Sequence, residues 1–247
     1  VNPITLFTNV DEILSTVATH IDSLTWPKPA NQTDPTLWTY DIGCNSDISV
    51  DYSLTDGVGR VFDFFRDHPR AKATFATKFV NRDLLSYDPK RKIRIRFSLM
   101  PAHVSRLVDV RTDSIEKRIA AINDFYDAGY EVHVNFSPVI VYGGKQWRTD
   151  YRELFGQLNE ALRPEVKAQL QSEVIFLTHN QFQHQANVVI NPKAEELLWV
   201  PALQESKQSQ FGGWNIRYDH QLKSKMVGVF ERMVQEEVPW CTIRYIF

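Results

Sequence analysis

The stretch that decides the fold is Ile93-Arg94-Ile95-Arg96-Phe97-Ser98, residues 93–98, in which apolar and polar side chains alternate strictly. Successive side chains of a strand point to opposite faces, so this pattern is typical of a strand with one apolar and one wet face. We therefore predict a strand over residues 93–100 whose apolar face packs against a core.

Segments with strand and helix patterns alternate on both sides of this stretch. The expected strands cover residues 4–8, 38–42, 73–79, 130–139, 173–179 and 242–247. The expected helices cover residues 10–21, 57–67, 82–86, 113–127, 147–162 and 222–236, and residues 204–213 are expected to form a loop. Alternation of this kind predicts right-handed βαβ units, a parallel sheet and thus an α/β fold. Repetition of the unit favours a closed or partly closed barrel.

Composition limits the class of protein. The chain has 247 residues, of which 43% are hydrophobic and 12% aromatic, which excludes a disordered chain and suits a single domain over residues 1–247. Within it we expect a barrel over residues 1–182 and a small helix-strand extension over residues 183–247. No apolar run approaches the roughly 20 residues of a membrane-spanning helix, so we expect no membrane association.

Charge and cysteine content add two further limits. With 28 basic and 30 acidic residues the net charge is −2, so affinity for nucleic acid would have to come from a basic stripe on one face. Two cysteines, Cys44 and Cys241, argue against a disulfide scaffold and favour a reducing, cytoplasmic location.

Polar or reactive side chains lie at or near the carboxyl ends of five of the expected strands. They are Cys44 with Ser46, then Lys78, Ser98, Ser137 and His179. The carboxyl ends of parallel strands meet at one mouth, where ligands bind. A serine in such a place is usually a helix cap, and a lone lysine or histidine is usually structural. The coincidence over five strands nevertheless favours a site.

Cys44 admits two interpretations from its neighbourhood. It follows Gly43 at a strand exit and lies outside any apolar stripe. A cysteine is most often a small buried hydrophobe, and the alternative is a reactive thiol at the mouth of the sheet. Cys241 follows Trp240 and is expected to pack in the core.

Other motifs are weak. Gly143-Gly144 lacks the spacing of a dinucleotide loop, and the sequence contains no phosphate-binding loop motif and no HExxH. His179 and His184, with His220 far along the chain, form no recognisable ligand set. The run Arg91, Lys92, Arg94 and Arg96 fits either phosphate contacts or a solvated strand face.

Several segments, taken in order, resemble the spore photoproduct lyase family. They are Tyr40-Asp41-Ile42-Gly43-Cys44-Asn45-Ser46-Asp47, Thr74-Phe75-Ala76-Thr77-Lys78-Phe79, Arg94-Ile95-Arg96-Phe97-Ser98, Ala128-Gly129-Tyr130, Phe136-Ser137-Pro138-Val139, the span from Trp147 to Phe155, and Phe176-Leu177-Thr178-His179. The resemblance covers residues 4–182 well and the remainder loosely. It rests on the order and spacing of the segments, because no single piece is specific.

The resemblance implies a partial (β/α)6 TIM-like barrel and radical S-adenosylmethionine (AdoMet) chemistry. Members of the family repair the thymine dimer 5-thyminyl-5,6-dihydrothymine in DNA. A 4Fe–4S cluster reduces AdoMet, the resulting 5′-deoxyadenosyl radical abstracts a hydrogen from the lesion, and a thiol returns a hydrogen atom to the product. The electron donor would be a flavodoxin or ferredoxin.

Residue roles follow from the resemblance by position. Cys44 matches the hydrogen-donating cysteine, which makes the reactive-thiol interpretation the favoured one. Positions lining the AdoMet pocket correspond to Ser46, Lys78, Ser98 and Ser137. Residues expected to contact substrate are His179, Arg96 and Tyr218.

Two departures from the family pattern qualify these roles. The CxxxCxxC run that ligates the cluster and the first barrel strand are absent from these residues, so the ligating cysteines are expected outside this chain. Asn180 follows His179 where DNA-lesion enzymes carry arginine, so a relative with another substrate is also an alternative. The competing hypotheses are a cluster-less barrel that binds nucleic acid or protein, and a thiol hydrolase with Cys44 as nucleophile and His179 as base.

Overall fold

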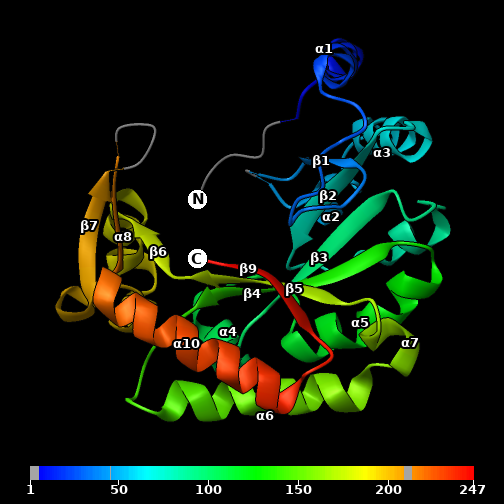
Figure 1. Cartoon of the computed structure of the whole chain (residues 1–247). Coiled ribbons are helices and arrows are strands. Elements are labelled where there is room, and N and C mark those ends of the chain that lie inside the picture. Colours follow the sequence, from blue (N-terminus) through cyan, green and yellow to red (C-terminus); the bar gives the residue numbers. More distant parts are fainter. Residues whose placement is uncertain (1–5, 45, 209–212) are drawn as a thin grey trace. The chain divides into compact units, whose positions relative to one another are not determined.

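The computed structural model describes residues 6–44, 46–208 and 213–247 (Figure 1). The chain divides into two compact units. The first comprises the residues up to Ser98 together with Ala120–Val134, and the second comprises Leu99–Ile119 together with Asn135–Phe247.

The main sheet has six strands in the order β1-β2-β3-β4-β5-β9. Their bounds are β1 (Trp38–Asp41), β2 (Ala71–Thr77), β3 (Ile93–Leu99), β4 (Glu131–Val139), β5 (Gln171–Phe176) and β9 (Thr242–Ile246). The pairs β1–β2, β2–β3 and β5–β9 are parallel. The prediction of an α/β fold on a parallel sheet is therefore confirmed, and the strand expected at residues 242–247 extends that sheet.

The side chains of β3 alternate between two faces as predicted, but the face expected to be solvent-exposed is buried. Ile93, Ile95 and Phe97 are fully buried, and Arg94 and Arg96 on the other face are buried too. Strands of parallel sheets are normally covered on both faces, which explains this outcome. The guanidinium groups are tolerated there because carboxylates pair with them.

The helical elements of the first unit are α1 (Val10–Ser23), α2 (Ile48–Asp51), α3 (Gly57–Asp67) and the 3-10 turn η1 (Arg82–Ser86). Helices α2 and α3 contact β2, and α1 contacts α3. Phe62 and Phe65 form the buried side of α3, and the ring of Phe62 stacks on that of Phe75 from β2 at 5.8 Å. Helix α5 (Ile115–Asp127) contributes residues to both units.

The second unit holds α4 (Ala102–Val108), α6 (Gln146–Ala161), α7 (Pro164–Lys167), α8 (Gln181–Ile190), α9 (Pro192–Leu198), η2 (Pro201–Leu203) and α10 (His220–Glu237). Helices α6 and α10 lie side by side (Figure 1). Phe230 of α10 meets Tyr151 and Phe155 of α6, with ring centroids 5.1 and 5.8 Å apart. The buried stripe of α10 also includes Met226 and Met233, as its spacing predicts.

A second, antiparallel sheet in this unit has the order β6-β8-β7, from β6 (Thr178–Asn180), β8 (Trp214–Tyr218) and β7 (Gln204–Gln208). It corrects two expectations. The strand predicted over residues 173–179 divides into β5 and β6, which belong to different sheets, and residues 204–208 form a strand instead of a loop.

One further expectation falls near the start of the chain. Leu6–Thr8 is not a strand, and the rest of the strand predicted at residues 4–8 lies outside the described residues. Among the described residues no helix is long and apolar enough to cross a membrane.

Candidate functional site

The strongest candidate site lies where β1 ends, at residues 41–44 and 46–47, which we call the thiol loop. Cys44 is exposed there as a free cysteine. Its Sγ lies 3.7 Å from the backbone oxygen of Asp41, to which the thiol donates. The loop therefore presents the thiol to solvent in a defined orientation.

Asp41 connects the thiol loop to the neighbouring strands. Its Oδ2 accepts from Arg96 Nη2 of β3 at 2.6 Å, and its Oδ1 accepts from the backbone N–H of Gly43 at 3.1 Å. Arg96 is almost fully buried, whereas Asp41 is partly exposed. A buried cation thus fixes, through one carboxylate, the backbone that carries Cys44.

Asp47 fixes the other end of the loop. Its carboxylate caps α2 by accepting from Ser49 N at 3.1 Å. It also accepts from the Thr77 hydroxyl at 2.7 Å and from the backbone N–H of Lys78 at 2.9 Å. One side chain therefore joins the thiol loop to the carboxyl end of β2.

The space around Gly43 favours the absence of a side chain. A Cβ added there would lie 3.1 Å from Ile48 Cγ1 and 3.2 Å from Phe75 Cβ, which is closer than about nine in ten real Cβ contacts. Phe75 is a fully buried strand residue, so it cannot easily yield.

The electrostatics of the loop keep Cys44 in its protonated form. Burial raises the pKa of the thiol above its ordinary value, the negative charge of Asp41 raises it further, and Arg96 opposes the shift. At neutral pH the side chain is therefore a thiol and not a thiolate.

The remaining predicted residues of the first unit occupy three environments. Ser46 is exposed, Lys78 is half-buried directly after β2, and Ser98 is buried near the end of β3. Asp47 contacts the backbone of Lys78, so the structure brings Lys78 next to the thiol loop.

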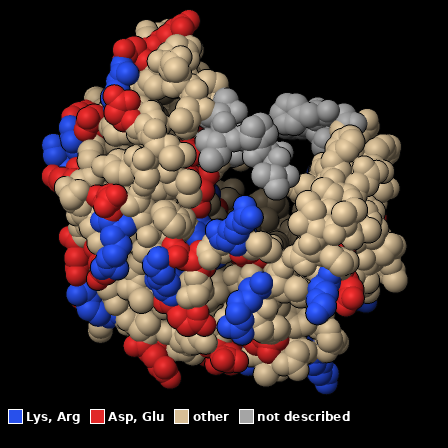
Figure 2. Space-filling model, turned by 180° about the vertical axis from the view of Figure 1, so that it is seen from behind, with Lys and Arg blue, Asp and Glu red and all other residues tan. Residues whose placement is uncertain are grey.

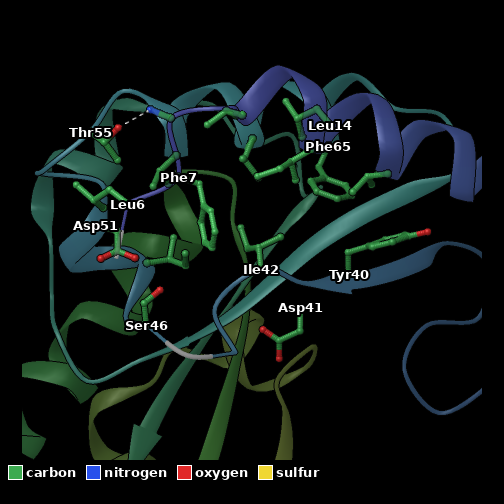
Figure 3. Close-up of a pocket in the computed structure, with 17 residues that line it drawn as sticks. Leu6, Phe7, Leu14, Tyr40, Asp41, Ile42, Ser46, Asp51, Thr55 and Phe65 are labelled. Atoms are coloured by element: carbon green, nitrogen blue, oxygen red, sulfur yellow. Dashed lines mark hydrogen bonds between the residues drawn. The ribbon is translucent and has the colours of Figure 1, made fainter. Parts of the chain in front are cut away.

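A cavity of about 340 Å³ lies between β1 and the helices α1 and α3 (Figure 3). Its walls are mainly apolar, with Leu14 and Phe65 among them, and Ser46 and Asp51 supply polar groups at one side. In Figure 3 Asp41 points away from the side on which Leu14 and Phe65 lie. The cavity is thus on the helix side of β1.

The basic run at residues 91–96 is not a solvated strand face, because Arg94 and Arg96 are buried. Arg94 and Arg96 pair with Glu131 and Asp41, and Arg91 and Lys92 donate to the backbone oxygens of Tyr130 and His68. On the face seen in Figure 2, basic and acidic side chains are intermingled.

The predicted residues of the second unit are buried or half-buried. Ser137 is half-buried on β4. Tyr218 is buried, its hydroxyl accepts from Val141 N at 2.8 Å, and burial raises its pKa to about 12. His179 is buried with its Nε2 3.0 Å from Glu195 Oε1.

Sequence reasoning missed the two carboxylates that organise the thiol loop. Asp41 and Asp47 flank Cys44 in the quoted motif, and aspartate is a preferred N-cap residue, so Asp47 before a helix was a usable signal. Their partners Arg96 and Thr77 are distant in sequence, and no local pattern identifies them.

Comparisons with known proteins agree on one family. The family model of spore photoproduct lyase matches residues 2–247. Spore photoproduct lyase of Bacillus subtilis (strain 168) is 29% identical over 170 residues, which are 68% of this chain and 46% of the relative. The Clostridium acetobutylicum enzyme is 23% identical over 155 residues, which are 62% of this chain and 43% of that protein. The chain thus spans about half the length of the curated relatives it matches.

Solved structures show the same fold. A spore photoproduct lyase mutant superposes with a TM-score of 0.85 at 21% identity, covering 98% of this chain and 68% of that one. A second mutant, with bound AdoMet and dinucleoside spore photoproduct, gives 0.84 at the same identity and coverage. The predicted fold is confirmed by this likeness.

Proposed function

Because the chain belongs to the spore photoproduct lyase family, we propose that it serves in the AdoMet-dependent reversal of 5-thyminyl-5,6-dihydrothymine in DNA, with Cys44 as hydrogen-atom donor. A relative's structure contains AdoMet and the dinucleoside photoproduct, which supports this substrate class. The proposed activity is that of a carbon–carbon lyase, and this chain supplies the hydrogen-donating thiol.

One observation carries the proposal: Cys44 is an exposed thiol whose pKa is raised. Only the protonated form has an S–H bond to give. On transfer that bond breaks homolytically, a C–H bond forms on the product radical, and a thiyl radical remains on Sγ until a hydrogen atom returns. An environment that protects the thiol suits this task and opposes thiolate chemistry.

Asp41, Arg96 and Asp47 are positioning residues in this scheme. Asp41 accepts from Arg96 and from the Gly43 N–H, and its backbone oxygen accepts from the thiol. Fixing the donor before the radical arrives matters, because a misplacement of about 1 Å is costly to rate. Arg96, expected from the resemblance to contact substrate, would act through Asp41.

The polar groups at or near the ends of β1, β2 and β3 support an AdoMet site there. Hydroxyls of Ser46 and Ser98 and the ammonium of Lys78 can hydrogen-bond to its carboxylate and ribose oxygens. AdoMet supplies the 5′-deoxyadenosyl radical when bound, and these three residues would hold and orient it. The corresponding role for Ser137, and substrate contact by Tyr218 and His179, stay predictions.

The residues of this chain do not fit a 4Fe–4S cluster. The sequence has two cysteines, Cys44 on the thiol loop and Cys241 buried in the second unit, whereas such a cluster is held by three or four thiolates. Cysteines outside these 247 residues would have to ligate it. Reduction by a flavodoxin or ferredoxin would take place at such a cluster, outside the residues of this chain.

Replacement of the thiol tests the donor role. In the protein that contains this chain, reconstituted with iron and sulfide and supplied with AdoMet and the dinucleoside photoproduct, Cys44→Ala should still cleave AdoMet. The thymine yield should fall at least about tenfold with new adducts in its place, because the product radical lacks its S–H donor. Cys241→Ala is the matched control and should give normal thymine. Normal thymine from Cys44→Ala would refute the assignment.

The competing hypotheses are less well supported. The family match and the structural likeness disfavour a cluster-less binding module. A thiol hydrolase needs a lowered thiol pKa, and the pKa of Cys44 is raised.

A further inference from the structure

Three potential metal ligands meet in the second unit, outside the thiol loop and its partners. His179 comes from β6, His184 from α8 and Glu195 from α9. One ligand atom of each lies within 4.8 Å of the others. Across the residues that the structure describes, no other three His, Cys, Asp or Glu side chains come together in this way.

The separations of these atoms are close to those in a metal site. Glu195 Oε1 lies 3.0 Å from His179 Nε2, and its Oε2 lies 2.5 Å from His184 Nδ1. Neighbouring ligand atoms around a tetrahedral zinc ion with bonds of about 2.1 Å are about 3.4 Å apart. Glu195 would have to move away from the two imidazoles by less than about 1 Å to reach this separation.

The three side chains of the cluster are surrounded by protein on most sides. The side chains of His179 and Glu195 are each 7% exposed, and that of His184 is 23% exposed. A nearly buried carboxylate is costly unless a cation or several donors compensate it. The partly exposed imidazole leaves a side from which an ion can enter.

A supporting shell orients the ligands. Asn187 Nδ2 donates to Glu195 Oε1 at 2.8 Å. The indole of Trp199 stacks on the ring of His184, with centroids 3.8 Å apart and planes 14° from parallel. Groups that hold ligand rings and carboxylates in place are a regular part of metal sites.

Local structure places each ligand independently. His179 pairs with Ile216 in the β6–β8 ladder. Asn180 caps α8 by accepting from Phe182 N at 2.8 Å, which puts His184 in the first turns of that helix. Pro192 opens α9, and Glu195 lies in its first turn.

We propose that His179, His184 and Glu195 form a site for a divalent transition-metal ion of the zinc type. Two imidazoles and one carboxylate are a donor set that such ions accept, with a fourth position left for water or another ligand. The ion would fasten β6, α8 and α9 to one another. Nothing in this inference depends on the lyase chemistry or on Cys44.

The experiment measures metal binding to the chain without a histidine tag. After treatment with EDTA, the protein is titrated with zinc chloride by calorimetry, and with Co²⁺ while the visible ligand-field absorption is recorded. We expect one Zn²⁺ per chain, a Co²⁺ spectrum that Zn²⁺ abolishes, and a higher melting temperature with Zn²⁺.

Variants assign the ion to the cluster. His184→Gln and Glu195→Gln should each weaken Zn²⁺ binding by about 100-fold or more, and Asn187→Ala, which leaves the ligands in place, by about tenfold. His220→Gln is the matched control, because His220 is exposed on α10, and it should leave the affinity unchanged. Circular dichroism shows whether each variant folds. If a ligand variant does not fold, the Zn²⁺ affinity of Asn187→Ala tests the assignment in its place.

Two results would overturn the proposal. One is the absence of stoichiometric Zn²⁺ binding in the unmodified chain, which would leave the cluster as a metal-free network in which both imidazoles donate to Glu195. The other is unchanged Zn²⁺ affinity in folded His184→Gln and Asn187→Ala, which would place the ion on surface histidines.

Discussion

The two ends of the polar face of β2, β3 and β4 in the first unit use charge in different ways. At the amino ends of these strands Lys72, Arg94 and Glu131 form a buried ion network with Asp34. Towards the carboxyl ends the pair of Arg96 with Asp41 adjoins an exposed thiol. Both ends contain an arginine paired with a carboxylate, but the ion pairs at the amino ends are more deeply buried.

Distances and burial define the amino-end network. Lys72 Nζ lies 2.5 Å from Asp34 Oδ2, and Arg94 Nε lies 2.7 Å from Glu131 Oε1. Lys72 pairs with Glu131 as well. These side chains are 2–18% exposed, whereas Asp41 at the other end is 38% exposed. In parallel barrels the carboxyl face carries function and the opposite face carries stability, and the two kinds of ion pair follow that division.

The largest expected effect comes from breaking the buried network. In Glu131→Gln, the cations Lys72 and Arg94 share only the carboxylate of Asp34. The buried positive charge that is left uncompensated should lower the unfolding free energy by about 3 kcal/mol. Urea denaturation followed by circular dichroism measures the loss. The control is Asp124→Asn in the same unit, whose exposed pair with Arg82 should contribute less than about 1 kcal/mol. Equal losses in the two variants would contradict the division.

A smaller effect is expected from acid. Burial raises the pKa of Asp34 and of Glu131, but hydrogen bonds and charges outweigh it: Lys72 and the Leu37 N–H act on Asp34, and His133 and Arg94 act on Glu131. Both pKa values are lowered in the folded chain, so the unfolded chain binds protons more readily.

The sign of the pH dependence follows. The stability from these carboxylates is complete above about pH 5 and is lost as the pH falls towards the folded-state pKa values. Unfolding free energies measured from pH 7 to about pH 3 should therefore decline at the acid end, and decline less steeply in Glu131→Gln. Parallel curves for the two proteins would show that Glu131 is not responsible.

The smallest expected effect concerns the carboxyl end. Asp41→Asn removes the negative charge that raises the pKa of Cys44 and leaves Arg96, which lowers it, so the thiol should ionise at lower pH. Alkylation of Cys44 by iodoacetamide, followed by mass spectrometry over a range of pH, reports the shift.

Asp56→Asn serves as the comparison for that measurement. Asp56 is exposed at the start of α3 in the same unit, and the variant should leave the alkylation profile of Cys44 unmoved. A profile that stays unchanged, or moves to higher pH, in Asp41→Asn would remove the electrostatic link between the two residues.

Much of the fold could be predicted from local pattern. The alternation at residues 93–98 and the apolar spacing at residues 57–67 led to β3 and α3 within one or two residues. The polar strand β7 was missed because its side chains are mostly exposed and its stability comes from pairing with β8. The division of residues 173–179 between two sheets has no local signal, since pairing partners decide it.

The candidate site, like the fold, could be predicted only in part from the sequence. Cys44 and Lys78 were predicted from their position after strands, and the structure joins their segments through Asp47. The His179–Glu195 contact and the Asp41–Arg96 pair were not foreseen, because each depends on tertiary placement of residues remote in sequence.

Gly43 has a practical consequence for anyone who redesigns the thiol loop. A Cβ at this position would crowd Ile48 and Phe75, so steric room favours the smallest residue here whatever its chemical role. Residues 44 and 46 are exposed and meet no such limit. A mutagenesis library aimed at altered product quenching should therefore hold residue 43 constant and diversify the two exposed positions.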